Sequence, residues 1–255
     1  MKQRKSKLLI DGDIICYQIA SQIEEPIHWG DDLWTLHSDF KTAKQKFNSY
    51  INDLKENLYL SDVLIFLSDR ESNFRKQLYP DYKANRQDRR KPVCLYEMFK
   101  WVKEEHNAIT EPRLEADDLL GIYSTNPDYK NSIIVSLDKD LKTIPGKLSP
   151  DGSNILKITQ KQAMYNHAVQ ILTGDPVDNY PGCPGIGIKT AIKLFTDVEG
   201  SKNFNHYWDI ILKSYKKAGL KEKDAITQAQ VSYILQWEDY DFKSKKIKKW
   251  KPGSN

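Results

Sequence analysis

Several aspartates stand just after apolar runs, where a carboxylate can bind a metal ion or close a turn. Asp11 follows "KLLI", Asp69 comes just after "DVLIFL", and Asp138 follows "SIIVSL", with Asp140 two residues further on. In an extended chain, Asp138 and Asp140 point to the same side. Open parallel sheets bind ligands beyond the carboxyl ends of their strands. We therefore expect these side chains to gather at one edge of a sheet.

Two further segments add carboxylates. "EPRLEADDLLG" is expected to form an amphipathic helix with Glu115 and Asp118 on one face. Asp117 lies about 100° around that helix from Asp118 and joins them less directly. In "TGDPVDNYPG", Asp175 and Asp178 are again three residues apart, in a loop or an opening helical turn.

A cluster of these carboxylates requires cations. Packed together, they would repel one another and raise their pKa values unless cations neutralised them. Oxygen ligands with room for water suit Mg²⁺ or Mn²⁺, whereas a wholly acidic set argues against zinc. Two such ions, about 4 Å apart, activate a water and stabilise the leaving oxygen of a phosphodiester. Any one Asp after a strand is more often a turn residue or a helix cap. Agreement among five segments favours the metal cluster.

The segment from residue 70 to residue 92, "RESNFRKQLYPDYKANRQDRRKP", is basic and interleaved with aromatic residues. Cations neutralise phosphates, and aromatic rings stack on unpaired bases. A solvated charged loop is the alternative. The aromatic interleaving and the neighbouring Asp69 favour contact with nucleic acid.

The segment "GCPGIGIKTAIKLF" resembles a phosphate-binding loop, but its spacing is wrong for one. Ile188 separates Gly187 from Lys189, which excludes a Walker motif, and Thr190 stands where a dinucleotide fingerprint needs a third small residue. A glycine hairpin between two helices fits better. Gly185 and Gly187 would let backbone N–H groups reach a DNA phosphate, and the carbonyls of such a turn can hold a monovalent cation. An ordinary turn between two helices is the alternative.

The elements that must position these residues alternate along the first part of the chain. Apolar runs without period-two alternation indicate parallel strands covered on both faces. Helical spacing over 40–60 and 94–106 separates them, which predicts an α/β domain over residues 1–160. Residues 161–255 are expected to be helical, with helices near 160–174, 189–198, 206–219 and 222–237. The Lys-rich segment 243–251 is either a frayed tail or an added phosphate contact.

Bulk composition sets outer limits on the kind of protein. The 255 residues are 39% hydrophobic and 29% charged, with a net charge of +4. No apolar run approaches the roughly 18 residues of a membrane span, and Asp11 and Asp13 interrupt the start too early for a signal peptide. We expect an intracellular protein whose three cysteines stay reduced.

Together these motifs resemble the 5′-nuclease superfamily, the flap endonucleases and 5′→3′ exonucleases with a PIN-like fold. The nearest likeness is to short exonucleases of podovirus-type bacteriophages. The matching pieces cover about residues 7–195, in family order: "LLIDGD", "FLSDRESNFRKQLYPDYKANR", "EPRLEADDLLG", "VSLDKDLKTIP" and "LTGDPVDNYPGCPGIGIKTA". The resemblance implies a mostly parallel sheet flanked by helices, followed by a helix–turn–helix region that holds duplex DNA.

The resemblance also implies roles for individual residues. Two or three Mg²⁺ ions, replaceable by Mn²⁺, would be surrounded by Asp11, Asp69, Glu115, Asp117, Asp118, Asp138, Asp140, Asp175 and Asp178; Asp13 is an addition with a less secure role. Residues 70–92 would form an arch over the site, the arch segment. In it Lys83 and Arg86 would grip the scissile phosphate, and Tyr82 would stack on the terminal base. The remaining DNA contacts would come from Arg75, Gly182, Gly185, Gly187 and Lys189, with potassium at the glycine hairpin.

The expected activity is 5′→3′ hydrolysis at ends, nicks or flaps of double-stranded DNA, with the RNA of an RNA–DNA hybrid as a second substrate. A monomer working beside replication proteins in the cytoplasm of an infected bacterial host fits this reading. Two rivals stay open. A haloacid-dehalogenase-type phosphatase would use Asp11 as nucleophile and Asp13 in a D-x-D pattern, although Ile14 stands where that pattern prefers Gly. A non-catalytic module that binds branched DNA is the other.

Overall fold

The computed structural model describes residues 6–86 and 89–253, and its centre is a five-stranded sheet in the order β4-β1-β5-β6-β7. The strands are β1 (Leu8–Asp11), β4 (Val63–Phe66), β5 (Ile133–Val135), β6 (Gly146–Ser149) and β7 (Leu156–Ile158). The pairs β1/β4, β1/β5 and β5/β6 are parallel, whereas β6 and β7 are antiparallel. The carboxyl ends of β1, β4 and β5 therefore meet at one edge, as predicted.

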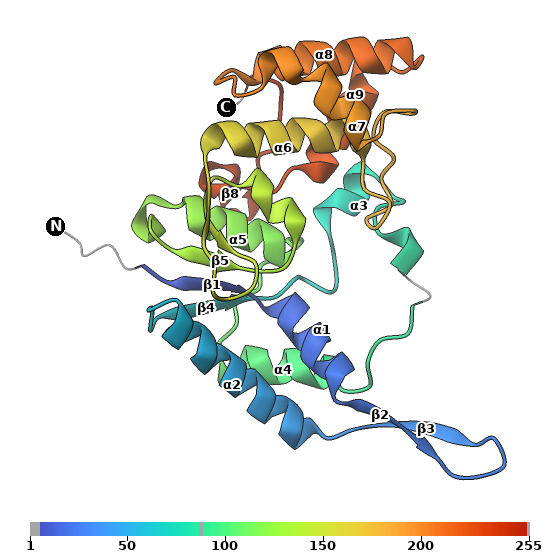
Figure 1. The fold of residues 1–255 in the computed structure, drawn as a ribbon, viewed down its shortest axis with the longest axis vertical. Helices are drawn as coiled ribbons and strands as arrows, with labels where there is room; N and C mark the ends of the chain where they lie inside the picture. The colour runs from blue at the N-terminus through green and yellow to red at the C-terminus, as the bar shows by residue number, and fades with distance from the viewer. Residues whose placement is uncertain (1–5, 87–88, 254–255) are drawn as a thin grey trace.

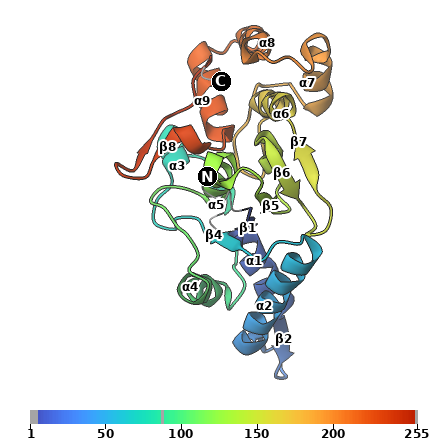
Figure 2. The same cartoon turned by 90° about the vertical axis from the view of Figure 1, so that its left-hand side faces the viewer.

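Helices cover both faces of this sheet (Figures 1 and 2). Alternation along β1 decides which core each side chain joins. Leu8 and Ile10 pack on one face with the helices α1, α2 and α4, whereas Leu9 packs on the other face with α5. The bounds are α1 (Gly12–Gln22), α2 (Phe40–Asn57), α4 (Leu95–Glu105) and α5 (Ala116–Thr125). The α/β prediction for the first part of the chain is thus confirmed.

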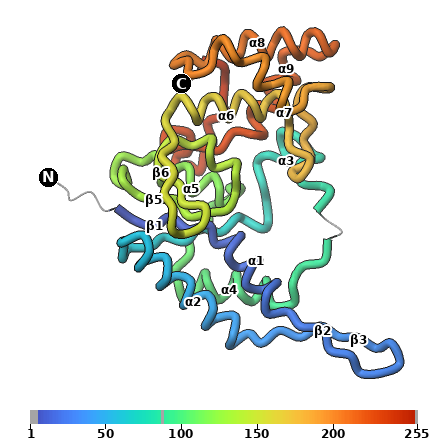
Figure 3. The backbone as a smooth tube through the Cα atoms, in the orientation of Figure 1, coloured from blue at the N-terminus to red at the C-terminus, as the bar shows by residue number. Residues whose placement is uncertain are grey.

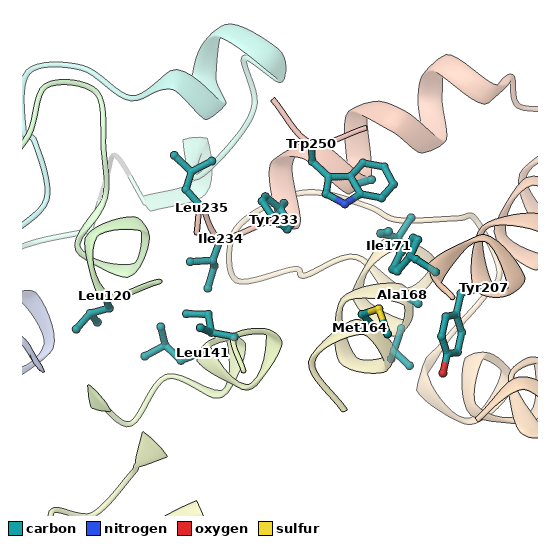
Figure 4. Packing of buried hydrophobic residues seen from close by; sticks show 14 of the residues in the cluster. Leu120, Leu141, Met164, Ala168, Ile171, Tyr207, Tyr233, Ile234, Leu235 and Trp250 are labelled. Carbon is teal, nitrogen blue, oxygen red and sulfur yellow. The ribbon is translucent and has the colours of Figure 1, made fainter. Parts of the chain in front are cut away.

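The region after residue 160 is mainly helical and shares a core with the sheet. Its helices are α6 (Gln160–Thr173), α7 (Ile188–Leu194), α8 (Phe204–Lys217) and α9 (Glu222–Ser232). One hydrophobic cluster runs from Leu9 and Phe66 through α5 and α6 to Trp250, and Figure 4 shows part of it. The predicted boundary near 160 falls at the start of α6, but no break in the core marks it.

The Lys-rich segment is folded, so the alternative of a frayed tail is wrong. Trp250 is 4% exposed and packs edge-on against Phe204 and Trp208. The Lys245 carbonyl accepts a hydrogen bond from Arg113, and its ammonium pairs with Glu111 at 2.6 Å. The indole and these contacts hold the segment while several of its lysines remain exposed.

Several short elements depart from the sequence prediction. A two-stranded hairpin of β2 (Glu24–His28) and β3 (Trp34–Ser38) projects from the body, as the tube in Figure 3 makes plain. A smaller pair, β8 (Tyr240–Asp241) and β9 (Lys246–Ile247), interrupts the region expected to be all helical. The predicted helix over 222–237 ends at Ser232, where the chain becomes extended. Short 3₁₀ turns fill the remainder: η1 (Ala84–Arg86), η2 (Pro127–Tyr129), η3 (Lys139–Thr143), η4 (Thr196–Val198) and η5 (Trp237–Asp239).

The arch segment leaves the end of β4 and rises to α3 (Phe74–Leu78) beside the helical region, then returns to α4 (Figure 1). Its far side is tied to the hairpin by an ion pair between Arg90 and Glu24 at 2.5 Å. Residues 87 and 88 lie outside the described part of the segment. Among the described residues, no helix is long and apolar enough to cross a membrane.

Candidate metal centre

The ends of β1 and β5 are joined through a serine that the sequence reading did not single out. Asp11 caps α1 by accepting a hydrogen bond from the Ile14 N–H at 3.1 Å, and its second oxygen accepts one from the Ser136 hydroxyl at 2.8 Å. Ser136 Oγ in turn accepts a hydrogen bond from the Asp138 N–H at 3.1 Å. Its place two residues before Asp138, at a strand end, was the available signal. Capping and metal binding are therefore compatible roles for Asp11.

Asp138 and Asp140 do not lie on an extended strand, so that part of the prediction is wrong. Asp138 is the N-cap of η3 and accepts a hydrogen bond from the Asp140 N–H at 2.8 Å. The strand ends at Val135, and η3 begins at Lys139. The turn still keeps the two carboxylates close enough for Asp138 to raise the pKa of Asp140.

Electrostatic interactions link five carboxylates through Asp138, which acts on Asp11, Asp117 and Asp140, while Asp175 acts on Asp140. We call these five the acidic cluster: Asp11, Asp117, Asp138, Asp140 and Asp175. Burial, with the charges of Asp13 and Asp138, raises the pKa of Asp11 to about 7. Burial and the charges of Asp11 and Asp138 raise the pKa of Asp117 well above its usual value. Burial, Asp138 and Asp175 raise the pKa of Asp140 to about 7. Such shifts mark negative charge that cations have not yet offset.

Glu115 lies beside the acidic cluster but faces the arch segment. Its Oε1 is 2.5 Å from the Lys83 ammonium, and its Oε2 accepts hydrogen bonds from Tyr82 at 2.9 Å and Arg75 at 3.2 Å. Burial alone would raise the pKa of Glu115, but the charges of Lys83 and Arg75 outweigh it and lower the pKa to about 2. Glu115 is thus ionised at neutral pH and paired with arch cations.

The loop 175–180 holds the arch segment from the other side. Asp178 forms ion pairs with Arg86 and, at 3.6 Å, with Lys83. The backbone also joins the two segments, because the Lys83 N–H donates to the Asp178 carbonyl at 2.8 Å. Lys83 has a left-handed φ of 56°, an uncommon conformation for a non-glycine residue that these contacts hold in place. Asp175 faces Lys139 at 3.2 Å.

Asp118 and Arg75 form a structural pair, and neither has the predicted role. Asp118 is fully buried; its two oxygens accept hydrogen bonds from the two terminal nitrogens of Arg75, each at 2.7 Å. The backbone N–H groups of Glu115 and Leu235 also donate to it. Arg75 is 2% exposed and donates to the carbonyls of Val231 and Tyr233. Asp118 therefore has no free oxygen edge for an ion, and Arg75 cannot reach DNA.

Tyr82 is also buried, at 3% exposure, so its ring face is not offered to a terminal base as predicted.

Two aspartates lie near the end of β4. Asp13 accepts hydrogen bonds from Arg70 at 2.9 Å and from the Ser68 N–H at 3.2 Å, which gives it a supporting place there. Asp69 accepts hydrogen bonds from the Glu71 and Arg113 N–H groups and from the Ser72 hydroxyl. Its part in metal binding stays a prediction.

The glycines of the hairpin divide into two kinds. A Cβ on Gly182 would lie 2.3 Å from the Gly174 nitrogen, so this glycine serves close backbone packing, and its contact with DNA stays a prediction. Around Gly185 and Gly187, a Cβ would meet nothing within 4 Å. Gly187 is the N-cap of α7, two residues before the exposed Lys189. These three residues keep the open surface that the prediction requires.

The donor set fits a hard divalent ion, although the oxygens do not yet converge. Within the described ranges, no three His, Cys, Asp or Glu side chains are grouped closely enough to hold one ion as they stand. Glu115, Asp175 and Asp178 face Lys83, Lys139 and Arg86 instead. The uncompensated carboxylates of Asp11, Asp117 and Asp140 are the oxygen ligands that Mg²⁺ and Mn²⁺ prefer.

Residues 6–175, which include the whole acidic cluster, match the family described as "5′-3′ exonuclease, N-terminal resolvase-like domain". This chain belongs to the 5′–3′ exonuclease family. The exodeoxyribonuclease of Enterobacteria phage T3 is 31% identical over 98% of this chain and 94% of its own length. The exonuclease of Escherichia phage T7 is 31% identical over 97% of this chain and 94% of its own length. The expected likeness to phage 5′-nucleases is confirmed.

Solved structures support the same fold for this 5′–3′ exonuclease family member. The T5 5′-exonuclease with divalent zinc ions bound superimposes with a TM-score of 0.60 at 16% identity, covering 91% of both chains. The T5 D15 protein co-crystallised with metal ions gives a TM-score of 0.62 at 15% identity, over 90% of this chain and 91% of that one. The predicted PIN-like α/β fold is confirmed.

Proposed function

We propose that this 5′–3′ exonuclease family member is a metal-dependent nuclease that hydrolyses phosphodiester bonds at 5′ ends, nicks or flaps of duplex DNA. The RNA of an RNA–DNA hybrid is the proposed second substrate. The observation that carries the proposal is the position of Lys83, which pairs with Glu115 and Asp178 and acts electrostatically on Asp117 of the acidic cluster. Negative charge that needs metal ions and positive charge that suits a phosphate thus adjoin.

The same proposal assigns ions and setting. Two or three Mg²⁺ ions, replaceable by Mn²⁺, would be held by Asp11, Asp117, Asp138, Asp140 and Asp175, with Glu115, Asp178 and Asp69 as further candidate ligands. Potassium would sit at the glycine hairpin. Because the T3 and T7 relatives are phage proteins, we place this chain in the cytoplasm of an infected bacterium, as a monomer beside replication proteins.

The divalent ions held by the acidic cluster would supply activation of the attacking water and stabilisation of the leaving 3′-oxygen. The chain's own residues do the remaining work. Lys83 and Arg86 bind the scissile phosphate and offset its developing charge. The backbone near Gly185 and Gly187, with Lys189, holds the duplex, because these glycines leave room for close approach of a phosphate.

A 5′-labelled flap duplex, incubated with Mg²⁺ and separately with EDTA, tests the proposal. We expect short 5′-phosphorylated products with Mg²⁺ and intact substrate with EDTA. The lengths of the labelled products distinguish stepwise exonuclease digestion from cleavage at the base of the flap. Binding without cleavage under both conditions would indicate the branched-DNA module. Phosphorylation of Asp11 after incubation with a small phosphate ester would indicate the phosphatase.

A further inference from the structure

Tyr82 is buried where three segments far apart in the sequence meet. Its ring packs with Tyr180 at a centroid distance of 6.5 Å and belongs to a small cluster with Val231. Its backbone N–H donates to the Tyr79 carbonyl at 3.0 Å. The side chain is therefore fixed by its surroundings, and its hydroxyl is its chemically active end.

That hydroxyl touches two carboxylates from different elements. Its oxygen is 2.9 Å from Glu115 Oε2, at the start of α5, and 3.0 Å from Asp178 Oδ2, in the loop 175–180. A phenol has one proton and donates to one acceptor at a time, so a second carboxylate this close needs positive charge nearby. Lys83 supplies it, 2.5 Å from Glu115 Oε1 and 3.6 Å from Asp178 Oδ2.

We propose that Tyr82 is a positioning residue for the metal centre, whose hydroxyl holds the carboxylates of Glu115 and Asp178 side by side. This inference rests on the proposed function. Ligands already oriented lose less side-chain freedom when an ion binds, and hydrogen-bond partners of metal ligands typically contribute 10–100-fold in metal affinity.

The position of Lys83 depends on the same clamp. Lys83 follows Tyr82 in the chain, its N–H donates to the Asp178 carbonyl, and its ammonium lies 4.9 Å from the Tyr82 ring centroid. A hydroxyl that keeps Glu115 and Asp178 together therefore also keeps the cation proposed to bind the phosphate next to the ions. The sequence predicted that Tyr82 stacks on a terminal base. In the structure its hydroxyl contacts the carboxylates of Glu115 and Asp178 instead.

The substitution Tyr82→Phe separates the packing of the ring from the hydrogen bonds of the hydroxyl, because it keeps the ring and removes only the hydroxyl. Mn²⁺ affinity is measured by calorimetry without DNA, and melting temperature is measured in parallel. We expect Mn²⁺ affinity to fall about tenfold or more. The Mg²⁺ concentration for half-maximal cleavage should rise by a similar factor, while KM for DNA changes little. Tyr79→Phe is the matched control, since Tyr79 packs against the same cluster from the same segment, and it should bind Mn²⁺ as the wild type does.

Unchanged Mn²⁺ affinity in Tyr82→Phe, or a loss equalled by Tyr79→Phe, would overturn the clamp and leave the proposed function standing. A raised KM for DNA with normal Mn²⁺ binding would also overturn it, in favour of a substrate contact. Wild-type protein that binds no Mn²⁺ would overturn both proposals at once.

Discussion

Three cations of the arch segment pair in alternation with three carboxylates, in the order Asp118, Arg75, Glu115, Lys83, Asp178 and Arg86. The burial and the contacts of each residue indicate whether its role is structural or functional. Arg75 and Asp118 use their full hydrogen-bonding capacity on each other, on Glu115 and on the backbone. Lys83, Arg86 and Asp178 keep part of their surface open. A buried, fully bonded pair maintains the fold, whereas a partly open one can exchange its partner for an ion or a phosphate.

Replacing Asp118 and Asp140 by asparagine should therefore have opposite effects on stability. Asp118→Asn breaks a buried ion pair, and we expect a loss of about 3 kcal/mol in the free energy of unfolding. Asp140→Asn removes a charge that burial and Asp138 disfavour, so stability in EDTA at pH 8 should stay equal or rise. Urea unfolding measures both variants. Cleavage should be lost in Asp140→Asn while DNA binding persists.

An Asp140→Asn variant as destabilised as Asp118→Asn would contradict the distinction. So would an Asp140→Asn variant with wild-type turnover, because the acidic cluster would then lack a catalytic role. An Asp118→Asn variant that folds and cleaves like the wild type would show that the ion pair between Arg75 and Asp118 is dispensable.

Which of these residues the sequence could identify depended on how local their partners are. Asp11 and Asp138 follow short apolar strands and cap the next turn, so neighbouring residues alone predict their place. Burial of Arg75 depends on the carbonyls of Val231 and Tyr233, 156 and 158 residues away. No local pattern separates such an arginine from one that binds DNA.

At the scale of elements, the glycine hairpin shows two different uses of the same residue. Gly182 packs against the Gly174 backbone, with a left-handed φ of 65°. Gly187 has an ordinary φ of −91° and open space where a side chain would lie. The fold therefore does not require glycine at position 187, so any requirement for glycine there would come from the proposed DNA contact.

Gly187→Val tests that requirement without straining the backbone. We expect unchanged melting temperature and Mn²⁺ affinity, with duplex affinity weakened about tenfold, equivalent to about 1.4 kcal/mol. Fluorescence anisotropy in EDTA measures duplex binding. Gly187→Ala should lie between the variant and the wild type. Equal duplex affinity in all three proteins would place the DNA elsewhere.

Long periodic helices and buried apolar strands were predictable, and strands without an apolar run were not. The apolar face of α2 and the strands β1, β4 and β5 follow directly from residue patterns. The hairpin of β2 and β3 was missed because its burial is too slight to produce a hydrophobic alternation. The strands β6, "GKLS", and β7, "LKI", each contain a lysine and no apolar run, and the sheet around them, not their own sequence, supports them.

At the scale of the whole molecule, the candidate site lies along the seam between the sheet and the helical region. The acidic cluster uses strand ends and α5 from the first 160 residues and Asp175 from the loop after α6. A shared hydrophobic cluster holds both regions together. The acidic cluster is therefore assembled only when both regions of the chain are folded together. For this reason no single segment of the sequence contains the whole site.

The most direct measurement is the anomalous signal of crystals of this chain grown or soaked with Mn²⁺. We predict ions bonded to carboxylate oxygens of Asp117, Asp138 and Asp140, at distances of about 2.0–2.3 Å. The Asp140→Asn variant should lose at least one of them. Mn²⁺ found only on unrelated surface groups, with the acidic cluster left without an ion at saturating concentration, would contradict a metal centre at these strand ends.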